Sequence, residues 1–168
     1  ENMSLAPHLL QQRFAPKNGP VTLVDSLFND GLTDAYSQDA MGITAENIVE
    51  KYGFTREEQD GFAVASQQKA AKAQEEGRFA SEITPVAVFN RKTKSDDLKV
   101  TDEFIRPNTT LESLEGLKPA FKKDGTVTAG NASGINDGAA CVIMTTREYA
   151  TELGLPILAT LKGYAEAG

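Results

Sequence analysis

The segment that decides the fold spans residues 124–140 and reads DGTVTAGNASGINDGAA. It holds four glycines among small residues, so it offers little apolar area to bury as a core of its own. Such a segment suits backbone that comes close to a packed helix or to a ligand. Residues 126–128 and 139–145 predict strands, and an α/β protein commonly carries a binding loop between two strands. From the residues alone, a ligand-facing loop and an ordinary connecting loop are equally supported.

The glycine spacing excludes two phosphate-binding signatures. Gly130, Gly134 and Gly138 recur at every fourth residue, whereas a P-loop needs Gly-Lys-Ser/Thr and the dinucleotide fingerprint needs Gly-x-Gly-x-x-Gly. Asn131 and Asn136 also disfavour one uninterrupted helix through the segment.

The composition is that of a globular protein. The chain has 168 residues with 40% hydrophobic and 24% charged content, enough for one domain, or for one domain and a piece of another. Its formal charge of −7 argues against nucleic acid as a partner, because binding nucleic acid needs a basic face. Since no apolar run approaches the length of a membrane span, we expect no membrane partner either.

The chain has one cysteine, Cys141, and one histidine, His8. One cysteine forms no internal disulfide, which predicts a reducing compartment and a cytoplasmic location. Zinc sites need several Cys and His ligands, so we expect no metal. Because Cys141 lies inside an apolar run, it is predicted to be a buried, unreactive thiol.

Capping signals predict four helices. Each begins at a threonine that can cap the helix N-terminus, and each ends near a glycine. Three of the threonines have a glutamate three residues later, which is the capping-box pattern. The predicted caps are Thr44, Thr55, Thr109 and Thr145, and the closing glycines are Gly53, Gly77, Gly116 and Gly154. Further strands are predicted at residues 82–89, 98–101 and 157–161, and residues 11–20 are predicted to form a loop.

Charge is uneven along the chain. Residues 89–123 carry eight basic and six acidic side chains, inside a chain of net charge −7. A solvated surface with ion pairs accounts for this pattern. The alternative is a basic collar for an anionic ligand near the glycine-rich segment, because arginine donates bidentately to phosphate.

Several motifs resemble, in order, those of the thiolase family, specifically the acetyl-CoA C-acetyltransferases. The resemblance covers essentially the whole chain. The motifs are ENMS at 1–4, DGLTD at 30–34, MGITAEN at 41–47, REEQD at 56–60 and KPAF at 118–121, followed by the whole segment 124–140.

The resemblance implies an α/β, thiolase-like fold. Thiolase subunits have two similar core domains, with a long loop domain inserted in the first. Residues 1–135 then correspond to the coenzyme A-binding loop (lid) domain, a mixed α+β unit with a tetramerisation segment near residues 11–24. Residues 136–168 correspond to a strand-helix-strand piece of the core. We therefore expect a segment of a longer polypeptide that assembles as a homotetramer.

The resemblance also implies a reaction. Family members condense two acetyl-CoA molecules to acetoacetyl-CoA and coenzyme A, or catalyse the reverse thiolysis. The coenzyme A thioester is the substrate, and no separate cofactor is expected. The family's nucleophilic cysteine, its histidine and its second cysteine match no residue of this chain. We therefore expect no catalytic residue here and no activity of the chain alone.

The implied coenzyme A surface combines small residues, apolar walls and a surface cation, which suits a slim arm that ends in a phosphorylated nucleotide. From residue type alone, its apolar members would be assigned to the core. The implied roles fall to Ala129 and Ser133 for the pantetheine arm, to Leu32, Met41 and Phe121 for the apolar tunnel and acyl pocket, and to Arg106 with Ser113 for the nucleotide end.

An alternative hypothesis is a stand-alone coenzyme A-binding or oligomerisation module without catalysis. The two hypotheses differ in what flanks the chain, because the enzyme needs a cysteine upstream and a Gly-His-Pro motif with a second cysteine downstream. The sequence departs from many biosynthetic members at Ala40, where they carry histidine. This departure leaves open the acyl chain length and the biosynthetic or degradative role.

Overall fold

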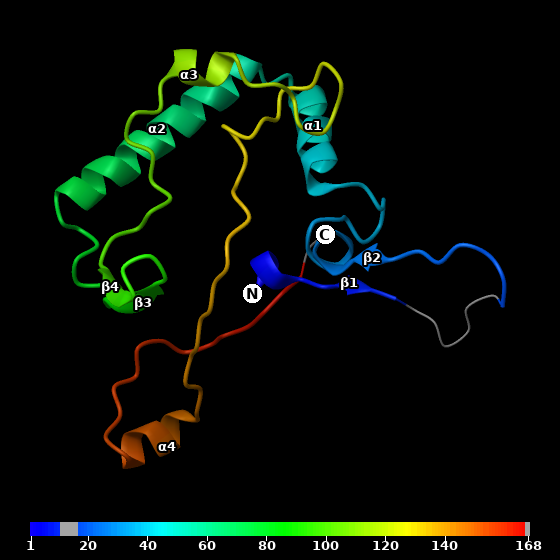
Figure 1. Ribbon diagram of the computed structural model, residues 1–168. Helices are drawn as coiled ribbons and strands as arrows, with labels where there is room; N and C mark the ends of the chain where they lie inside the picture. Colours follow the sequence, from blue (N-terminus) through cyan, green and yellow to red (C-terminus); the bar gives the residue numbers. More distant parts are fainter. Residues whose placement is uncertain (11–16, 167–168) are drawn as a thin grey trace.

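The structure, a computed structural model, describes residues 1–10 and 17–166. The described residues form four α-helices and two antiparallel strand pairs, a mixed α/β architecture. Helices α1 and α2 meet at an angle, and the first part of the glycine-rich segment lies between their adjoining ends (Figure 1). The predicted mixture of helices and strands is confirmed.

Helix α2 spans Arg56–Glu75 and begins at the predicted capping box. The Thr55 hydroxyl accepts the backbone N–H of Glu58 at 3.1 Å, and the Glu58 carboxylate accepts the backbone N–H of Thr55 at 2.8 Å. These two bonds satisfy N–H groups that a helix start leaves without partners. Beyond the helix, Gly77 adopts a left-handed conformation with φ of 70°, as the prediction of a closing glycine required.

Helix α1 spans Met41–Tyr52 and begins earlier than predicted. Its cap position is Ala40, so the prediction of a cap at Thr44 was wrong. The Thr44 hydroxyl instead donates to the carbonyl of Met41 at 2.6 Å, inside the helix. A threonine can bond back to its own helix as readily as it caps one, and residue type does not distinguish the two. The end at Gly53 is confirmed, with φ of 73°.

Helices α3, Leu111–Glu115, and α4, Arg147–Glu152, begin one residue later than predicted. Their capping threonines are Thr110 and Thr146 rather than the residues before them. The hydroxyl of Thr109 donates instead to the carbonyl of Arg106 at 2.8 Å. In both places two threonines are adjacent, so the pattern located the helix but not the cap.

The strands pair as two antiparallel ribbons. Strand β1, His8–Leu9, pairs with β2, Val24–Asp25, and β3, Val86–Asn90, pairs with β4, Ser95–Lys99. The predicted strands at 82–89 and 98–101 thus correspond to one hairpin with shifted bounds. The predicted loop at 11–20 and the tetramerisation segment at 11–24 lie partly outside the described residues.

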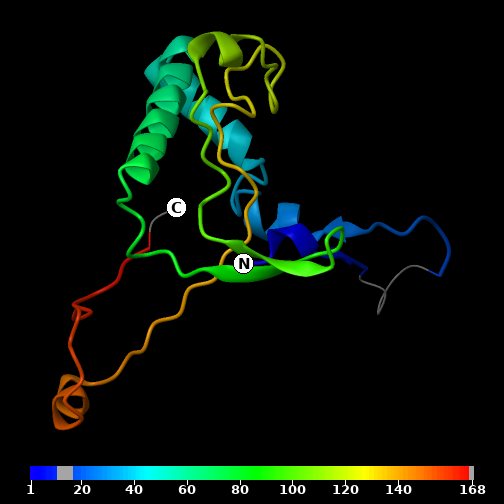
Figure 2. The same ribbon diagram turned by 60° about the vertical axis from the view of Figure 1, so that its left-hand side comes forward.

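Three other predicted strands were wrong. Residues 126–128 contribute only an isolated bridge between Thr128 and Pro119. Residues 139–145 and 157–161, all of them described, pair with no strand, and Figure 2 shows the first of these segments running away from the helices. A strand needs a neighbour for its backbone groups, and the described chain supplies none there. For the same reason Cys141, predicted to be buried, is exposed.

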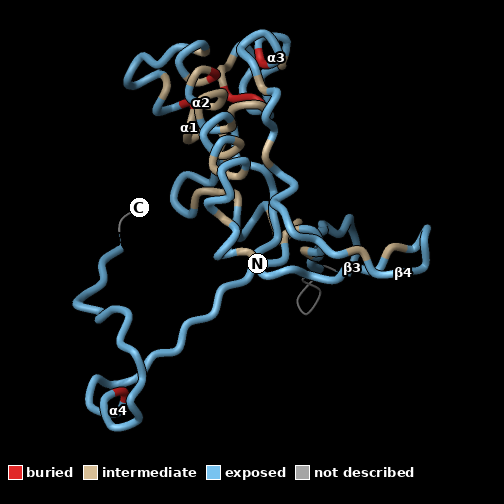
Figure 3. The backbone as a smooth tube through the Cα atoms, turned by 90° about the vertical axis from the view of Figure 1, so that its left-hand side faces the viewer, coloured by how far each residue is buried: buried red, intermediate tan, exposed pale blue. Residues whose placement is uncertain are grey.

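Apart from Ala150 of α4, the buried residues gather where α1, α2 and α3 meet the start of the glycine-rich segment (Figure 3). Leu114 and Val127 are the apolar members of this cluster, and Glu46, Asp60 and Thr128 are the polar ones. This small core mixes apolar and polar side chains in similar number. Among the described residues, no helix is both long and apolar enough to cross a membrane.

The first residues of the chain lie beside the end of the glycine-rich segment. The amino group of Glu1 donates to the carbonyl of Gly138 at 2.7 Å, and the Ser4 amide donates to the Asp137 carboxylate at 2.9 Å. The predicted domain boundary between residues 135 and 136 falls close to this contact, and it stays a prediction.

We expect Thr55→Ala to lower the free energy of unfolding by about 1 kcal/mol, because it removes the cap of the longest helix. Thr55→Ser keeps the capping oxygen and is the matched control. Urea unfolding of both variants measures the difference. An equal loss in the two variants would mean that the methyl group, not the hydroxyl, carries the effect.

Candidate functional site

A cavity of about 630 Å³ lies between α3 and the glycine-rich segment. One wall comes from residues 104–109, from α3 and from Leu117 just beyond it. The other wall comes from small residues of the glycine-rich segment, Ala129, Gly130, Ala132 and Gly134. The structure thereby brings together three residues that the sequence assigned to one surface, namely Arg106, Ser113 and Ala129.

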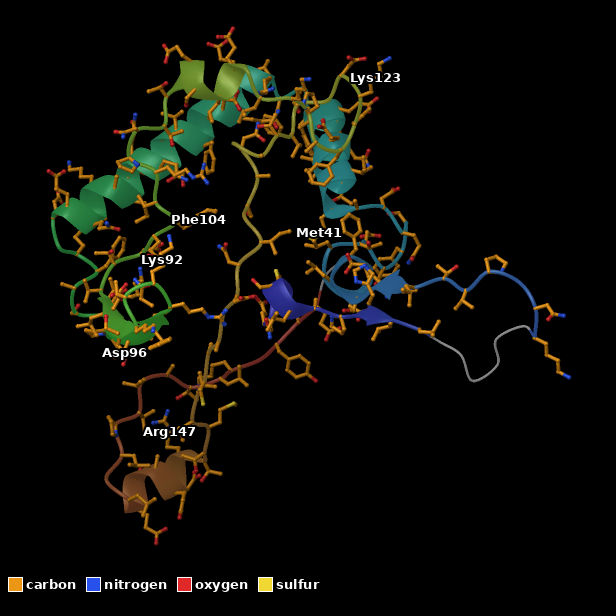
Figure 4. All side chains as sticks on the ribbon, viewed as in Figure 1. Met41, Lys92, Asp96, Phe104, Lys123 and Arg147 are labelled. Carbon is orange, nitrogen blue, oxygen red and sulfur yellow. The ribbon has the colours of Figure 1, made fainter. Side chains whose placement is uncertain are left out.

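Two glycines allow the backbone to approach the cavity walls closely. A Cβ atom on Gly130 would lie 2.6 Å from Leu114 Cδ2 and from Leu117 Cδ1. A Cβ on Gly134 would collide with the ring of Phe104, which is labelled in Figure 4. The interpretation of these glycines as positions of close approach is confirmed at Gly130 and Gly134.

A buried carboxylate from α1 holds the segment where it enters the cavity wall. Glu46 is 3% exposed, and its Oε1 atom accepts the backbone N–H groups of Thr126 and Val127, each at 2.8 Å. Burial raises the pKa of Glu46, but these bonds and the nearby Lys122 ammonium outweigh burial and leave the pKa below the usual value for glutamate. The side chain is therefore a carboxylate that anchors the segment.

The side chain of Asn131 closes the turn at residues 126–131 by hydrogen bonds to the backbone of the same turn. Its Nδ2 donates to the carbonyl of Thr126 at 3.0 Å and to Asp60 Oδ1 at 2.9 Å, while its Oδ1 accepts the amide of Thr128 at 2.8 Å. The turn between these residues carries Ala129 and Gly130. The two cavity residues are thus presented by a hydrogen-bonded turn rather than by a loose loop.

Arg106 reaches the cavity from a loop that is fixed to α2. Its backbone N–H donates to Gln67 Oε1 at 2.8 Å, and Gln67 also lines the cavity. The Arg106 guanidinium forms no ion pair with any of the described residues. Of the other basic side chains in region 89–123, Lys99 and Lys122 form surface ion pairs. The interpretation as a solvated surface with ion pairs is confirmed at Lys99 and Lys122, and the basic collar for an anionic ligand stays a prediction.

Ser113 has a structural role that the sequence did not predict. Its hydroxyl accepts the backbone N–H of Thr110 at 3.0 Å and donates to the carbonyl of Thr110 at 2.7 Å. The side chain thus belongs to the capping box of α3, and its hydroxyl hydrogen already forms a bond to the carbonyl of Thr110. Ser133 is exposed, and it lies between Ala132 and Gly134 without lining the cavity itself.

The three predicted apolar residues form a separate group at the start of α1. The backbone N–H of Met41 donates to the carbonyl of Leu32 at 2.9 Å, and the Phe121 ring lies against Gly42, the next residue of the helix. Met41 is 56% exposed and Phe121 is 41% exposed, so these are surface side chains rather than core. Figure 4 shows Met41 at the end of α1, away from α3.

The residues that sequence reasoning missed are the polar side chains that hold these walls. The buried acids among them, Glu46 and Asp60, lie in the motifs at 41–47 and 56–60, which carried the resemblance but received no individual role. Amphipathic patterns assign charged residues to the solvent side of a helix, so they gave no signal that Glu46 and Asp60 are buried. In the described part of the chain, no cluster of three or more His, Cys, Asp or Glu side chains could hold a metal ion.

The chain matches the family described as the thiolase N-terminal domain over residues 1–148. It is 56% identical to the acetyl-CoA acetyltransferases of Pseudomonas aeruginosa and Cupriavidus necator, over 100% of this chain and 43% of each relative. A probable acetyl-CoA acyltransferase of Staphylococcus aureus is 55% identical over the same shares. The chain thus spans less than half the length of these curated relatives.

Solved structures give the same similarity. Human mitochondrial 3-ketoacyl-CoA thiolase matches with a TM-score of 0.80 and 42% identity, over 93% of this chain and 39% of that one. A structure of the same enzyme in complex with CoA matches with a TM-score of 0.76 and 42% identity, over 93% and 38%. The Bacillus anthracis acetyl-CoA acetyltransferase matches with a TM-score of 0.76 and 43% identity, over 92% and 39%.

We expect Gly130→Ala to lower the free energy of unfolding by about 1–3 kcal/mol, because the added methyl group must displace Leu114 and Leu117. Gly138→Ala is the control, since a Cβ at Gly138 would meet no atom within 4 Å. Urea unfolding of both variants measures the effect. Equal stabilities of the two variants would contradict the close packing at Gly130.

The lowered pKa of Glu46 predicts how stability depends on pH. A group whose pKa is lowered by folding stabilises the protein above its unfolded-state pKa, and this contribution is lost as the pH falls through the folded-state pKa. We expect Glu46→Gln to be less stable than the unsubstituted protein by about 1–2 kcal/mol at neutral pH. This difference should shrink as the pH falls below the usual glutamate pKa.

Urea unfolding across a series of pH values measures that difference. Glu50→Gln is the control, because Glu50 is an exposed residue of the same helix that forms only a surface ion pair with Lys122. Its stability should stay within about 0.5 kcal/mol of the unsubstituted protein. A Glu46→Gln difference that does not change with pH would contradict the assignment.

Proposed function

The chain belongs to the thiolase family, and on that basis we propose that it provides the coenzyme A-binding surface of an acetyl-CoA acetyltransferase. The observation that carries the proposal is the cavity beside α3, where Arg106, Ser113 and Ala129 meet. Relatives named acetyl-CoA acetyltransferase are 56% identical across the whole chain, and a thiolase of similar fold was solved in complex with CoA.

The reaction proposed for the complete protein joins two acetyl-CoA molecules to acetoacetyl-CoA and coenzyme A, or runs in reverse as thiolysis. The nucleophile and the acid/base groups that the resemblance implies match no residue of this chain. Its own residues then bind and orient the thioester rather than react with it, and the chain alone is proposed to be inactive. Cytoplasmic location and a homotetramer remain predictions.

The cavity wall suits the pantetheine arm. A slim chain of methylene and amide groups can lie close to backbone only where side chains are small, and Ala129, Gly130 and Ala132 form such a wall. Gly130 packs against Leu114 and Leu117, and this contact sets the distance between the glycine-rich wall and the end of α3. Ser133, exposed beside this wall, is proposed to hydrogen-bond the arm.

The cation at the cavity suits the nucleotide end. The Arg106 guanidinium has no ion-pair partner among the described residues, and its backbone is fixed to Gln67 of α2. Arginine offers a planar fork of donors that matches phosphate. In this proposal Ser113 lies near the nucleotide and shapes the wall by capping α3.

The apolar group at the start of α1 suits the acyl end and the tunnel. Leu32 is half-buried, Met41 is an exposed apolar residue at the start of α1, and the exposed Phe121 ring lies against Gly42, the next residue of the helix. Exposed apolar groups of this kind commonly mark binding surfaces.

We expect Arg106→Ala, in the full-length protein, to weaken the binding of coenzyme A roughly tenfold, because it removes a charged hydrogen bond at a partly solvated site. Binding of a pantetheine thioester that lacks the nucleotide should not change. Isothermal titration with both ligands measures the contrast, and Arg91→Ala, which lies in the turn between β3 and β4, is the control for charge. Equal affinities of Arg106→Ala and Arg91→Ala for coenzyme A would contradict the proposal.

A further inference from the structure

We infer that Asp60 is a positioning residue that ties the two walls of the cavity together and thereby sets the affinity for coenzyme A. This inference rests on the proposed function, because it concerns the same cavity. Asp60 is 4% exposed and does not line the cavity. Its effect on a ligand must therefore pass through the groups that it holds.

Each carboxylate oxygen of Asp60 holds a different partner. Oδ2 accepts from Nε of Arg56 at 2.7 Å, and Oδ1 accepts from Nδ2 of Asn131 at 2.9 Å. Arg56 lies one helical turn before Asp60 on α2, whereas Asn131 belongs to the glycine-rich segment. A single buried side chain thus connects the long helix to the segment that forms one cavity wall.

Arg56 carries the connection to the other wall. Its Nη2 donates to the carbonyl of Leu114 at 2.6 Å, and its Nη1 donates to the carbonyl of Leu117 at 3.2 Å. The Leu114 carbonyl, near the end of α3, also accepts the backbone N–H of Leu117 at 3.0 Å. Arg56 therefore adds a charged donor to this carbonyl and a second one to the carbonyl of Leu117, just beyond the helix. The side chains of Leu114 and Leu117 line the cavity, so Arg56 fixes the residues that form this wall.

Asn131 carries the connection to the glycine wall. Its bonds to Thr126 and Thr128 close the turn that presents Gly130, and Gly130 packs directly against Leu114 and Leu117. The chain of contacts therefore forms a closed circuit that runs from α3 through Arg56, Asp60 and Asn131 to Gly130 and back to α3. Removal of Asp60 would break two polar links of this circuit, the one to Arg56 and the one to Asn131.

The chemistry of the links suggests a discriminating substitution. Asp60→Asn keeps an oxygen that can accept from Asn131, but its amide nitrogen cannot accept from Nε of Arg56. The Arg56 guanidinium, whose side chain is 26% exposed, then loses its carboxylate, and its hold on the end of α3 weakens. Arg56→Lys makes the complementary change, because it keeps the charge beside Asp60 but lacks the fork that reaches both carbonyls.

We expect Asp60→Asn, in the full-length protein, to weaken coenzyme A binding about tenfold, as judged from the usual contribution of a charged hydrogen bond. The KM for the coenzyme A substrate should rise by a similar factor, and kcat should change less than about threefold, because Asp60 touches no reacting atom. Arg56→Lys should weaken binding in the same direction. Glu57→Gln, an exposed acid between the two residues, is the matched control and should change nothing.

Isothermal titration with coenzyme A, steady-state kinetics and melting temperature are measured for the three variants and for Arg106→Ala. A lowered melting temperature with an unchanged dissociation constant in Asp60→Asn would overturn the inference, since Asp60 would then act only on stability. A fall in kcat without a change in KM would overturn it as well. If Asp60→Asn does not fold, the dissociation constant of Arg56→Lys decides, and an unchanged value overturns the inference.

The same titrations separate this inference from the proposed function. If Arg106→Ala weakens coenzyme A binding and Asp60→Asn does not, the binding surface stands and only the positioning role fails. If the unsubstituted protein does not bind coenzyme A, or Arg106→Ala binds it equally well, the proposed function fails, and the positioning role fails with it.

Discussion

The structure depends on two buried carboxylates that hold one turn of backbone between two helices. Glu46 of α1 and Asp60 of α2 face the turn at 126–131, and both are almost fully buried. A buried charge is costly unless hydrogen bonds satisfy it. Both oxygens of each carboxylate have a donor, so the charges become anchors. Few apolar side chains are buried in the described chain. The hydrogen bonds of Glu46 and Asp60 therefore contribute much of what fixes the segment at 126–131 against α1 and α2.

The glycine-rich segment can face a ligand because the anchors act beside the cavity wall and not within it. Thr126, Val127 and Asn131 form the hydrogen bonds to Glu46 and Asp60. Ala129 and Gly130 form none of these bonds, so small residues can occupy the positions at the cavity wall. Small residues alone would give a wall without a fixed position, since glycine increases the freedom of the backbone. Because anchored residues flank the small ones, the backbone at the wall can lie close to a ligand while its position stays fixed.

What the sequence predicted well was local. The capping box of Thr55 and Glu58 needs only residues three apart, and it was confirmed. Contacts between distant residues were not predictable in the same way. The link from Glu46 to Val127 joins positions 81 apart, and neither residue type signals it. The strands expected at 139–145 and 157–161 failed for a related reason, because a strand exists only where a second strand accepts it.

The contacts that shape the candidate cavity all lie within residues 46–134. Residues 139–166 take no part in them, although they hold highly exposed apolar side chains such as Ile143 and Leu158. The walls of the candidate cavity are therefore held without contacts to these later segments. A binding surface built on its own hydrogen-bond circuit can keep its width while neighbouring parts of a fold assemble around it, and this separation explains how so small a core positions a site.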